Sequence, residues 1–211
     1  MRSIPANSIS SLSLSKRLKT MRLARFIGED NKGCYSRHIG SVIVDESNFV
    51  KSTGYNAPPK GTPHTDDYTY LKEYLWPRLN EEEKNKLSSL VLNRQNSLKD
   101  ECEIVCGALH GGKQCPRQLL GYKSGEATGH CSCVHSEENA ILTARQSVKG
   151  CFLFGFCPVS CIGCTKSIVQ AEITEVHFLN SIYDKSSLVL YKFANIPIFL
   201  YSEDELNESL C

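Results

Sequence analysis

Four residues with the chemistry of a metal site lie close together in the second half of the chain. The stretch CVHSEENAIL contains His135 and Glu137, and CPVSCIGC contains Cys161 and Cys164. An imidazole and two thiolates are good ligands for Zn²⁺, and three protein ligands leave a fourth tetrahedral position open for water. Glu137 is two residues from His135, so its carboxylate can reach that water and take its proton. The pattern predicts a catalytic zinc centre with His135, Cys161 and Cys164 as ligands and Glu137 as proton shuttle.

The elements that must position these residues are two helices and a strand. HSEENAILTARQS and SCIGCTKSIVQAE read as helices, and GCFLFGFC between them reads as a strand. With each motif in the first turn of its helix, two helix N-termini face one point. The partial positive charge of a helix N-terminus helps a cysteine lose its proton. The alternatives are chance and a structural Cys-rich zinc knot, but a compact knot would not need a helix and a strand between its ligands.

The rest of the chain predicts an α/β protein. We expect a helix at about 17–29, a strand pair formed by SVIV and NFVKSTGY around the turn DESN, and two helices within 67–94 that break at Pro77. Asn80 is the predicted N-cap of the second of these helices. Residues 105–133 read as a Gly- and Cys-rich loop. The strand ITEVHFLN, the helix SSLVLYKFAN and the strand IPIFLYS follow the motif helices, and this alternation predicts a partly parallel sheet between helices.

The predicted organisation is a flexible arm at 1–17 and a single domain at 18–211, with a helical insertion at about 67–105. The first 28 residues contain no Asp or Glu and are rich in Ser and basic residues, a composition that would also fit an organelle transit peptide. We favour an arm that runs into the first helix, because apolar residues from Leu18 onward recur at helical spacing. The insertion is either a decorative helical pair or an oligomer or effector surface.

Composition excludes several classes of protein. The 211 residues carry a net charge of +1, which gives no global signature of nucleic-acid or membrane binding. The apolar fraction of 41% is enough for an ordinary core, and no run of 18 apolar residues is present. Eleven cysteines are unusual for this length. Their odd number and the missing secretory signal favour reduced thiols and metal ligands over a disulfide framework, and make a cytoplasmic location the default expectation.

With these motifs placed, the chain resembles the deoxycytidylate (dCMP) deaminase family of the zinc-dependent cytidine deaminase superfamily. HSEENAIL and SCIGCTKSIV carry the resemblance to the superfamily. IGSVIVDESNFVKSTGYNAPPKGTPH resembles the first hairpin and Gly-Tyr-Asn loop of the dCMP deaminases, CPRQLLGYKSGEATGHCSCVHSEENAI their Cys-rich segment, and ITEVHF a later strand. The resemblance covers roughly residues 18 to 200. It implies a three-layer α/β/α sandwich with a mixed, largely five-stranded sheet.

The activity that the resemblance implies is hydrolysis of dCMP to dUMP with release of ammonia, which would supply dUMP for thymidylate synthesis. Carried over by position, His135, Cys161 and Cys164 hold zinc, and Glu137 protonates N3 of cytosine and then the leaving amine. Asn56 would hydrogen-bond the sugar or phosphate, although Asn is also an ordinary turn residue. Members are often hexamers activated by dCTP and inhibited by dTTP, so we expect a homo-oligomer, hexamer or dimer, with such effectors and Mg²⁺ accompanying a bound nucleotide.

The remaining cysteines suggest a second, structural zinc, because some dCMP deaminases carry one at matching places. The expected ligands are Cys34, Cys115, Cys131 and Cys133, with Cys106, His64 and His110 as substitutes. Four soft ligands would close a tetrahedral site, but the same residues would also serve as small buried hydrophobes. Arg37, next to the first predicted strand, is a candidate for the nucleotide phosphate or a solvated surface charge.

One departure from the family pattern concerns the second motif, where Pro usually precedes the first cysteine. Here Ser160 precedes Cys161, and Pro158 lies three residues before that cysteine. Ser160 is a good N-cap, so the helix start is expected to survive with a reshaped loop. Two rival functions remain open: deamination of another cytosine nucleoside or nucleotide such as dCTP or deoxycytidine, and a catalytically inactive, zinc-stabilised effector-sensing module. The Ser–Pro exchange is the sequence feature that favours the inactive module, and Glu137 argues against it.

Overall fold

The computed structural model of the protein describes all residues except 1–9, 32, 92–100, 124–125, 183 and 209–211. The chain divides into two compact units. The first comprises residues 1–32, 38–56 and 134–211, and the second comprises 33–37 and 57–133. The helical insertion expected at about 67–105 therefore lies inside a longer second unit. Among the described residues, no helix combines the length and apolar character needed to cross a membrane.

The first unit is built on a five-stranded mixed sheet in the order β2-β1-β3-β4-β5. The strands are β1 (Gly40–Val44), β2 (Val50–Tyr55), β3 (Phe152–Gly155), β4 (Glu175–Leu179) and β5 (Ile198–Tyr201). β1 pairs antiparallel with β2 and with β3, whereas β3 with β4 and β4 with β5 pair in parallel. The hairpin and the partly parallel sheet expected from the sequence are both confirmed.

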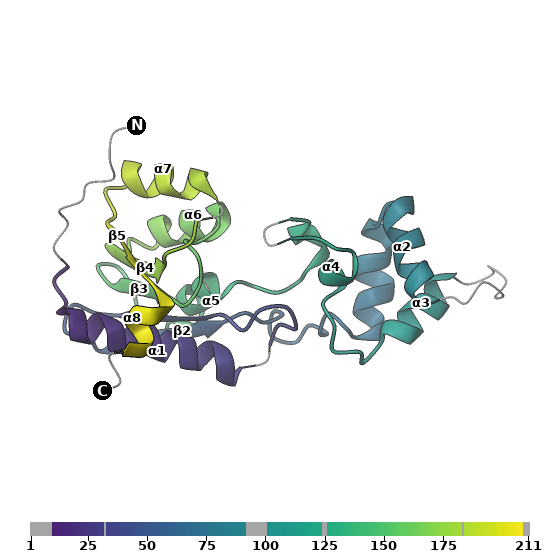
Figure 1. The fold of residues 1–211 in the computed structure, drawn as a ribbon, viewed down its shortest axis with the longest axis horizontal. Helices are drawn as coiled ribbons and strands as arrows, with labels where there is room; N and C mark the ends of the chain where they lie inside the picture. Colours follow the sequence, from purple (N-terminus) through teal and green to yellow (C-terminus); the bar gives the residue numbers. More distant parts are fainter. Residues whose placement is uncertain (1–9, 32, 92–100, 124–125, 183, 209–211) are drawn as a thin grey trace. The chain divides into compact units, whose positions relative to one another are not determined.

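Helices cover both faces of this sheet and complete the predicted three-layer α/β/α sandwich (Figure 1). They are α1 (Leu14–Asp30), α5 (Ser136–Thr143), α6 (Ile162–Gln170), α7 (Lys185–Phe193) and α8 (Glu203–Glu208). In Figure 1, α6 and α7 lie over one face, and α1 and α8 lie over the other. α5 packs mainly on β2 and β1, and it also contacts α6. The two helices that carry the metal motif are therefore neighbours on one face.

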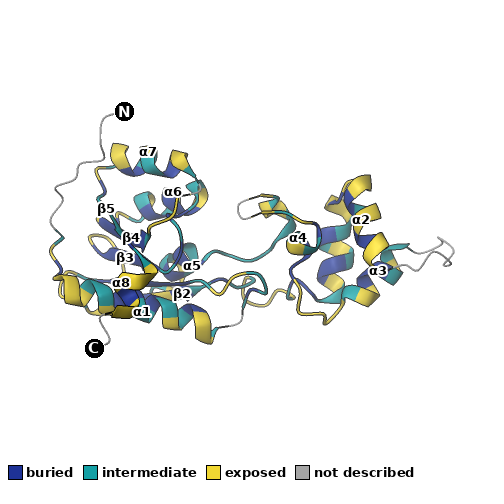
Figure 2. Ribbon diagram, in the orientation of Figure 1, coloured by how far each residue is buried: buried dark blue, intermediate teal, exposed yellow. Residues whose placement is uncertain are grey.

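Strand periodicity divides the buried side chains between these two faces. Figure 2 marks each residue of the ribbon by its burial, and β1, β3 and β4 consist almost entirely of buried residues. Ile43 and Leu153 point into a core with α5, α6 and α7. Their sequence neighbours Val42 and Phe154 point into a second core with Met21 of α1. Alternate residues of a strand face opposite sides of a sheet, so strands buried on both sides read as continuous apolar runs, as SVIV and CFLF do here.

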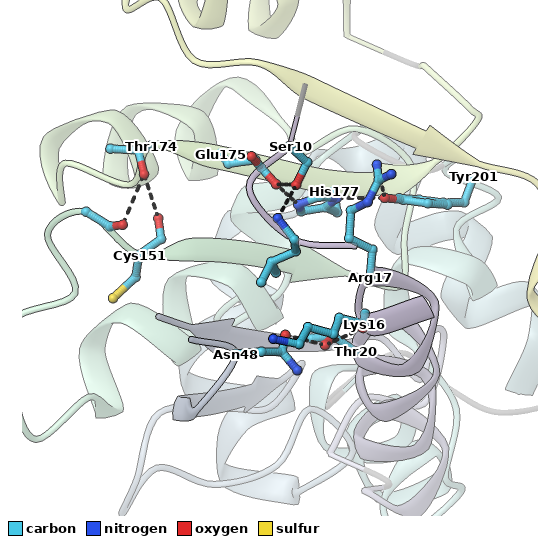
Figure 3. Close-up of polar contacts among 12 residues, drawn as sticks. Ser10, Lys16, Arg17, Thr20, Asn48, Cys151, Thr174, Glu175, His177 and Tyr201 are labelled. Atoms are coloured by element: carbon cyan, nitrogen blue, oxygen red, sulfur yellow. Dashed lines mark hydrogen bonds and ion pairs between the residues drawn. The ribbon is translucent and has the colours of Figure 1, made fainter. Parts of the chain in front are cut away.

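A fully buried histidine lies in the sheet on the α1 side (Figure 3). His177 of β4 stacks on Phe154 of β3, with ring centroids 3.9 Å apart. It also stacks on Phe199 of β5, with ring centroids 5.0 Å apart. Nε2 of His177 lies 2.7 Å from Oε1 of Glu175, and Nδ1 lies 2.9 Å from the hydroxyl of Tyr201. A neutral imidazole satisfies both contacts, because Nε2–H donates to the carboxylate while Nδ1 accepts from the phenol.

The N-terminal residues are tied to the same cluster. Ser10 donates a hydrogen bond to Glu175, and Arg17 of α1 donates to the Tyr201 hydroxyl at 3.3 Å. Figure 3 shows both side chains reaching the cluster from the chain segment at the start of α1. The predicted arm 1–17 is therefore shorter in the structure, because α1 begins at Leu14 with Ser13 as its N-cap.

The second unit is a small helical assembly with its own apolar core. A π-helical turn at Tyr70–Leu75 and a 3-10 turn at Trp76–Arg78 precede α2 (Glu81–Val91) and α3 (Glu101–Leu109). The break at Pro77 is confirmed. Asn80 caps α2 as predicted: Asn80 Oδ1 accepts from Glu83 N at 2.9 Å, and Glu83 Oε2 accepts from Asn80 N at 2.7 Å.

The prediction of an unbroken loop at 105–133 is wrong in part. α3 extends to Leu109, α4 spans Pro116–Leu119, and a 3-10 turn spans Thr128–His130. Val105 and Cys106 are buried in the core of the second unit. The Gly and Cys content suggested a loop, but tertiary packing of one apolar face stabilises a short helix of weak propensity.

Candidate metal centre

The metal motif occupies the N-termini of two adjacent helices, as predicted. His135 is the N-cap of α5 and Glu137 lies in its first turn. Cys161 is the N-cap of α6 and Cys164 lies in its first turn. β3, which runs between the two helices in the chain, sets their spacing because it pairs with β1 on one side and β4 on the other.

The three predicted ligand side chains converge. Nδ1 of His135 lies 3.5 Å from Sγ of Cys161 and 3.3 Å from Sγ of Cys164. In a tetrahedral site with ordinary Zn–N and Zn–S bonds, these atoms would be about 3.6 Å apart. Within the described part of the chain, this is the only group of three or more His, Cys, Asp or Glu residues whose ligand atoms all lie within 4.8 Å of one another. The residues present fit a zinc ion with three protein ligands.

The thiols of this group differ in acidity. A hydrogen bond with Cys164 lowers the pKa of the Cys161 thiol to about 4, against the opposing effect of burial and with help from His135. The same hydrogen bond raises the pKa of Cys164, which is more deeply buried. Thiolates are the ligands that Zn²⁺ requires, so Cys161 is already in the form that binds metal at neutral pH.

Glu137 is buried beside this group and held by hydroxyl and thiol donors. Its carboxylate is 4% exposed, and burial raises its pKa although the neighbouring His135 acts in the opposite direction. Oε2 accepts a hydrogen bond from Ser136 Oγ at 2.9 Å, and Oε1 is 3.9 Å from Cys157 Sγ. A carboxylate with a raised pKa is suited to accept a proton and deliver it again.

Asn56 contacts the start of α5. Its Oδ1 accepts a hydrogen bond from the backbone N–H of Ser136 at 2.8 Å, and Asn139 Nδ2 donates back to the carbonyl of Tyr55 at 2.8 Å. β2 approaches the helix closely because Gly54 has no side chain: a Cβ there would lie 2.2 Å from the carbonyl oxygen of Ser136. The Gly-Tyr-Asn stretch therefore fixes the position of α5, a role the sequence did not predict for Asn56.

The prediction that Ser160 caps α6 is wrong, because Cys161 is the N-cap and its sulfur accepts from the backbone N–H of Cys164. Ser160 is fully buried and turns its hydroxyl to Tyr191 of α7 at 2.6 Å and to Thr165 of α6 at 2.8 Å. These contacts hold the loop where the family usually has Pro. The exchange therefore leaves the ligand group intact, and it no longer favours an inactive module.

The cysteines predicted to bind a second zinc lie in the second unit. Interaction with the Cys133 side chain lowers the pKa of Cys34 to about 4 and that of Cys131 to about 6. The backbone N–H of Cys133 also donates to Cys131 Sγ at 3.4 Å. Cys115 is buried, with no such contact to the other three among the interactions described. The four do not form a group with all ligand atoms within 4.8 Å. The ten cysteines that the structure describes all have free thiols.

Arg37 is exposed and belongs to the second unit, so its role at a phosphate stays a prediction. The contacts of Ser41 and Ser136 with the site were not predicted. Ser136 stands between His135 and Glu137 in the motif, so its position was a signal, whereas Ser41 is hidden in a buried strand.

This fold and this ligand group define a cytidine deaminase-like zinc protein. The chain belongs to the cytidine and deoxycytidylate deaminase family: the family model described as "Cytidine and deoxycytidylate deaminase zinc-binding region" matches residues 14–180. The dCMP deaminase family named from the sequence motifs is thereby supported, together with the prediction of zinc.

Relatives and solved structures agree with this assignment. The chain is 30% identical over 139 residues to the deoxycytidylate deaminase of Saccharomyces cerevisiae, covering 57% of this chain and 44% of that protein. It is 25% identical over 174 residues to the deoxycytidylate deaminase of Schizosaccharomyces pombe, covering 82% of this chain and 40% of that protein. The chain thus spans less than half the length of these relatives.

The fold is similar to that of the dCMP deaminase from cyanophage S-TIM5. The structure of that enzyme in complex with dCMP and dUMP gives a TM-score of 0.53 at 15% identity, covering 90% of this chain and 99% of that chain. Its apo form gives a TM-score of 0.52 at 13% identity, covering 90% of this chain and 100% of that chain. At this level of identity the similarity establishes the fold.

Proposed function

We propose that the protein catalyses the zinc-dependent hydrolytic deamination of dCMP to dUMP with release of ammonia. The observation that carries the proposal is the convergence of His135, Cys161 and Cys164 beside the buried carboxylate of Glu137. Family membership supports zinc, and the names of the two fungal relatives and the dCMP- and dUMP-bound phage enzyme support dCMP as the substrate.

In this proposal each residue has a separate task. His135, Cys161 and Cys164 hold the metal through Nδ1 and two sulfur atoms. A zinc ion in such a site lowers the pKa of a water molecule and so supplies a nucleophile at neutral pH. Glu137 would take one proton from the attacking water and pass it to N3 of cytosine, and would then take the second proton of that oxygen and pass it to the departing amine. Burial supports this role because it raises the pKa of the carboxylate and keeps other acids and bases away.

Substrate binding is assigned to Asn56 and Arg37. Asn56 uses Oδ1 on Ser136, so its Nδ2 donor is the group we assign to a sugar or phosphate oxygen of dCMP. Arg37 is assigned to the phosphate, because a guanidinium suits bidentate phosphate contacts.

The finer features of the family belong to the same proposal. We propose a structural zinc at Cys34, Cys131 and Cys133 with Cys115 as fourth ligand, supported by the lowered pKa values of Cys34 and Cys131 beside Cys133. We further propose that dCTP and dTTP, with Mg²⁺, regulate the protein and that it forms a homo-oligomer. We also propose a cytoplasmic location, where thiols stay reduced. The ten free thiols of the described residues support the last of these.

The test is ammonia release by the purified, zinc-loaded full chain from dCMP, dCTP, deoxycytidine and cytidine, with and without dCTP as effector. Glu137→Gln removes the proton shuttle without changing side-chain size and should lower kcat by about 100-fold or more. Glu138→Gln is the matched control, because Glu138 lies next in the same helical turn and contacts Ser167 instead.

The outcomes separate the candidates. Turnover of dCMP alone, lost in Glu137→Gln and kept in Glu138→Gln, supports the proposal. Preference for another cytosine substrate would retain the deaminase and overturn dCMP as the substrate, and preference for a nucleoside would also overturn the assignment of Arg37 to a phosphate. A zinc-loaded protein that releases no ammonia from any of the four would overturn the activity and favour an effector-sensing module.

A further inference from the structure

Two buried serines outside the set of expected catalytic residues connect β1 to the shuttle carboxylate. Ser41 lies on β1 and Ser136 on α5, and both are fully buried. Their hydroxyl oxygens are 2.8 Å apart, and Ser136 Oγ is also 2.9 Å from Oε2 of Glu137. The three groups form a continuous chain of hydrogen bonds from the centre of the sheet to the proton shuttle.

Counting protons fixes the direction of this chain. An ionised carboxylate only accepts hydrogen bonds, so Ser136 must give its single hydroxyl proton to Glu137. The oxygen of Ser136 then accepts, and the proton between the two serines comes from Ser41. Hydrogen bonds that follow one another in this way polarise and strengthen each other in a low-dielectric interior.

The backbone of Ser136 is fixed as well. Its N–H donates to Asn56 Oδ1 at 2.8 Å, and its carbonyl oxygen is in close contact with Gly54, which allows no Cβ there. The backbone of Ser136 is thus fixed by two contacts, and its hydroxyl is held by Ser41 and Glu137. The hydroxyl therefore has little freedom to follow a moving carboxylate. It is therefore a rigid donor, which is what accurate placement of a general acid and base requires.

From this geometry we infer that Ser136, polarised by Ser41, is a positioning residue that holds Oε2 of Glu137 and so aims the carboxylate for proton transfer. The inference rests on the proposed deaminase activity. Ser136 would act through Glu137 and would not touch the substrate.

Ser136→Ala should lower kcat by about 10- to 100-fold, because a misplaced general base loses much of its contribution. KM for the cytosine substrate and the zinc-to-protein ratio should stay unchanged. Ser41→Ala should lower kcat by a smaller factor, since it removes only the polarising donor. In the double variant, Ser41→Ala should cost nothing further, because its effect passes through the Ser136 hydroxyl.

Ser52→Ala is the matched control. Ser52 is a buried serine on the neighbouring strand β2, and its hydroxyl donates to the carbonyl of Ala140 in the same helix α5 at 2.6 Å. It removes a buried hydroxyl bond between sheet and helix without touching Glu137. Its kcat should equal that of the wild type even if its stability falls, so equal losses of kcat in Ser52→Ala and Ser136→Ala would overturn the inference.

Crystal structures of the wild type and Ser136→Ala give a readout that does not depend on turnover. The carboxylate of Glu137 should be displaced or should occupy two conformers in Ser136→Ala and should keep its place in Ser52→Ala. An undisplaced carboxylate with unchanged kcat overturns the inference.

If the wild type releases no ammonia from any cytosine substrate, the proposed function fails, and the structures alone decide the positioning role. Should Ser136→Ala fail to fold, Ser41→Ala decides: an unchanged kcat and carboxylate overturn the inference.

Discussion

Nδ1 of His135 lies 3.3 Å from Sγ of Cys164, although the two residues are 29 positions apart in the sequence. The contact joins the starts of two helices, and β3 lies between them in the chain. The two residues belong to different helices on the same face of the sheet, so the ligand group exists only when the sheet and both helices have formed. Metal binding is therefore coupled to folding of the first unit.

Cys164→Ser should abolish stable zinc binding at the group formed with His135 and Cys161, so the zinc-to-protein ratio should fall by one relative to the wild type. A serine hydroxyl is a poor substitute for a thiolate, so the affinity should fall by more than the roughly 10- to 100-fold that loss of an outer-shell partner costs. The zinc-to-protein ratio after dialysis, measured by mass spectrometry, checks this expectation. Cys151→Ser is the control, because Cys151 is a buried thiol of the same unit outside the ligand group.

The same pair of variants links metal to stability. A chelator should lower the thermal midpoint of the wild type and of Cys151→Ser, because a ligand that binds only the folded state stabilises it. The fall should be smaller in Cys164→Ser, which keeps only the proposed structural zinc. A chelator effect in Cys164→Ser equal to that of the wild type would mean that another group holds the stabilising ion.

Gly54→Ala should destabilise the first unit by about 1–3 kcal/mol or more and lower activity together with stability. Its Cβ would lie 2.2 Å from the carbonyl oxygen of Ser136 and 2.3 Å from the backbone nitrogen of Ala140. Both are backbone atoms of α5, so the helix itself must shift. Gly107→Ala in α3 is the control: no atom lies within 4 Å of its Cβ, and the helix should gain about 0.5–1 kcal/mol. Urea unfolding measures both, and a neutral Gly54→Ala would show that β2 and α5 can separate without loss.

The sequence predicted the parts of the site whose signal is local. His135, Glu137, Cys161 and Cys164 stand in two short motifs at helix starts. The spacing of apolar residues in the flanking sequence distinguishes the strands from the helices. Burial of both faces of the sheet could be read from apolar runs such as SVIV. Local chemistry and local periodicity were enough for the fold class and the ligand group.

The parts that escaped prediction depend on long-range contacts. Ser41 is 95 residues from Ser136, and nothing in its strand marks it as a partner of the site. Ser160 was expected to cap a helix because of its local preference for that position. Instead its hydroxyl is hydrogen-bonded with the hydroxyl of Tyr191, 31 residues away, and Cys161 is the N-cap of α6. In each case a tertiary contact decided between locally acceptable alternatives.

Ser160→Ala should cost about 1–3 kcal/mol, because it leaves the buried hydroxyl of Tyr191 without this partner. The loss of Ser160 leaves the Thr165 hydroxyl with a partner, because that hydroxyl also donates to the carbonyl of Cys161 at 2.9 Å. Tyr191→Phe in the Ser160→Ala background should recover most of the loss, because removing both partners of a buried hydrogen bond is far less costly than removing one. Urea unfolding of the two single variants and the double variant completes the cycle. Simple addition of the two single costs would contradict a direct bond between these hydroxyls.

Stability should fall as the pH drops below about 6.5, because of His177. Burial lowers the pKa of His177 below its ordinary value of 6.5, although the Glu175 carboxylate opposes the shift. The unfolded chain therefore binds a proton before the folded one does, and acid favours unfolding. Burial acts to raise the pKa of Glu175, but hydrogen bonds with His177 and Ser10 outweigh it and lower the pKa below 4.5. The contribution of Glu175 is thus lost only at more acid pH, as its carboxylate is protonated.

His177→Gln separates this effect from the general acid response. The variant should be less stable than the wild type at pH 7, since it loses the stacking on Phe154, and it should lose less stability between pH 7 and pH 5. His38→Gln, at an exposed position, should keep the wild-type pH dependence. Free energies of unfolding from urea titrations at pH 7, 6 and 5 provide the comparison. If His177→Gln and the wild type lose equal stability over this range, the pKa of His177 is the same in the folded and unfolded chain, and the lowering by burial is wrong.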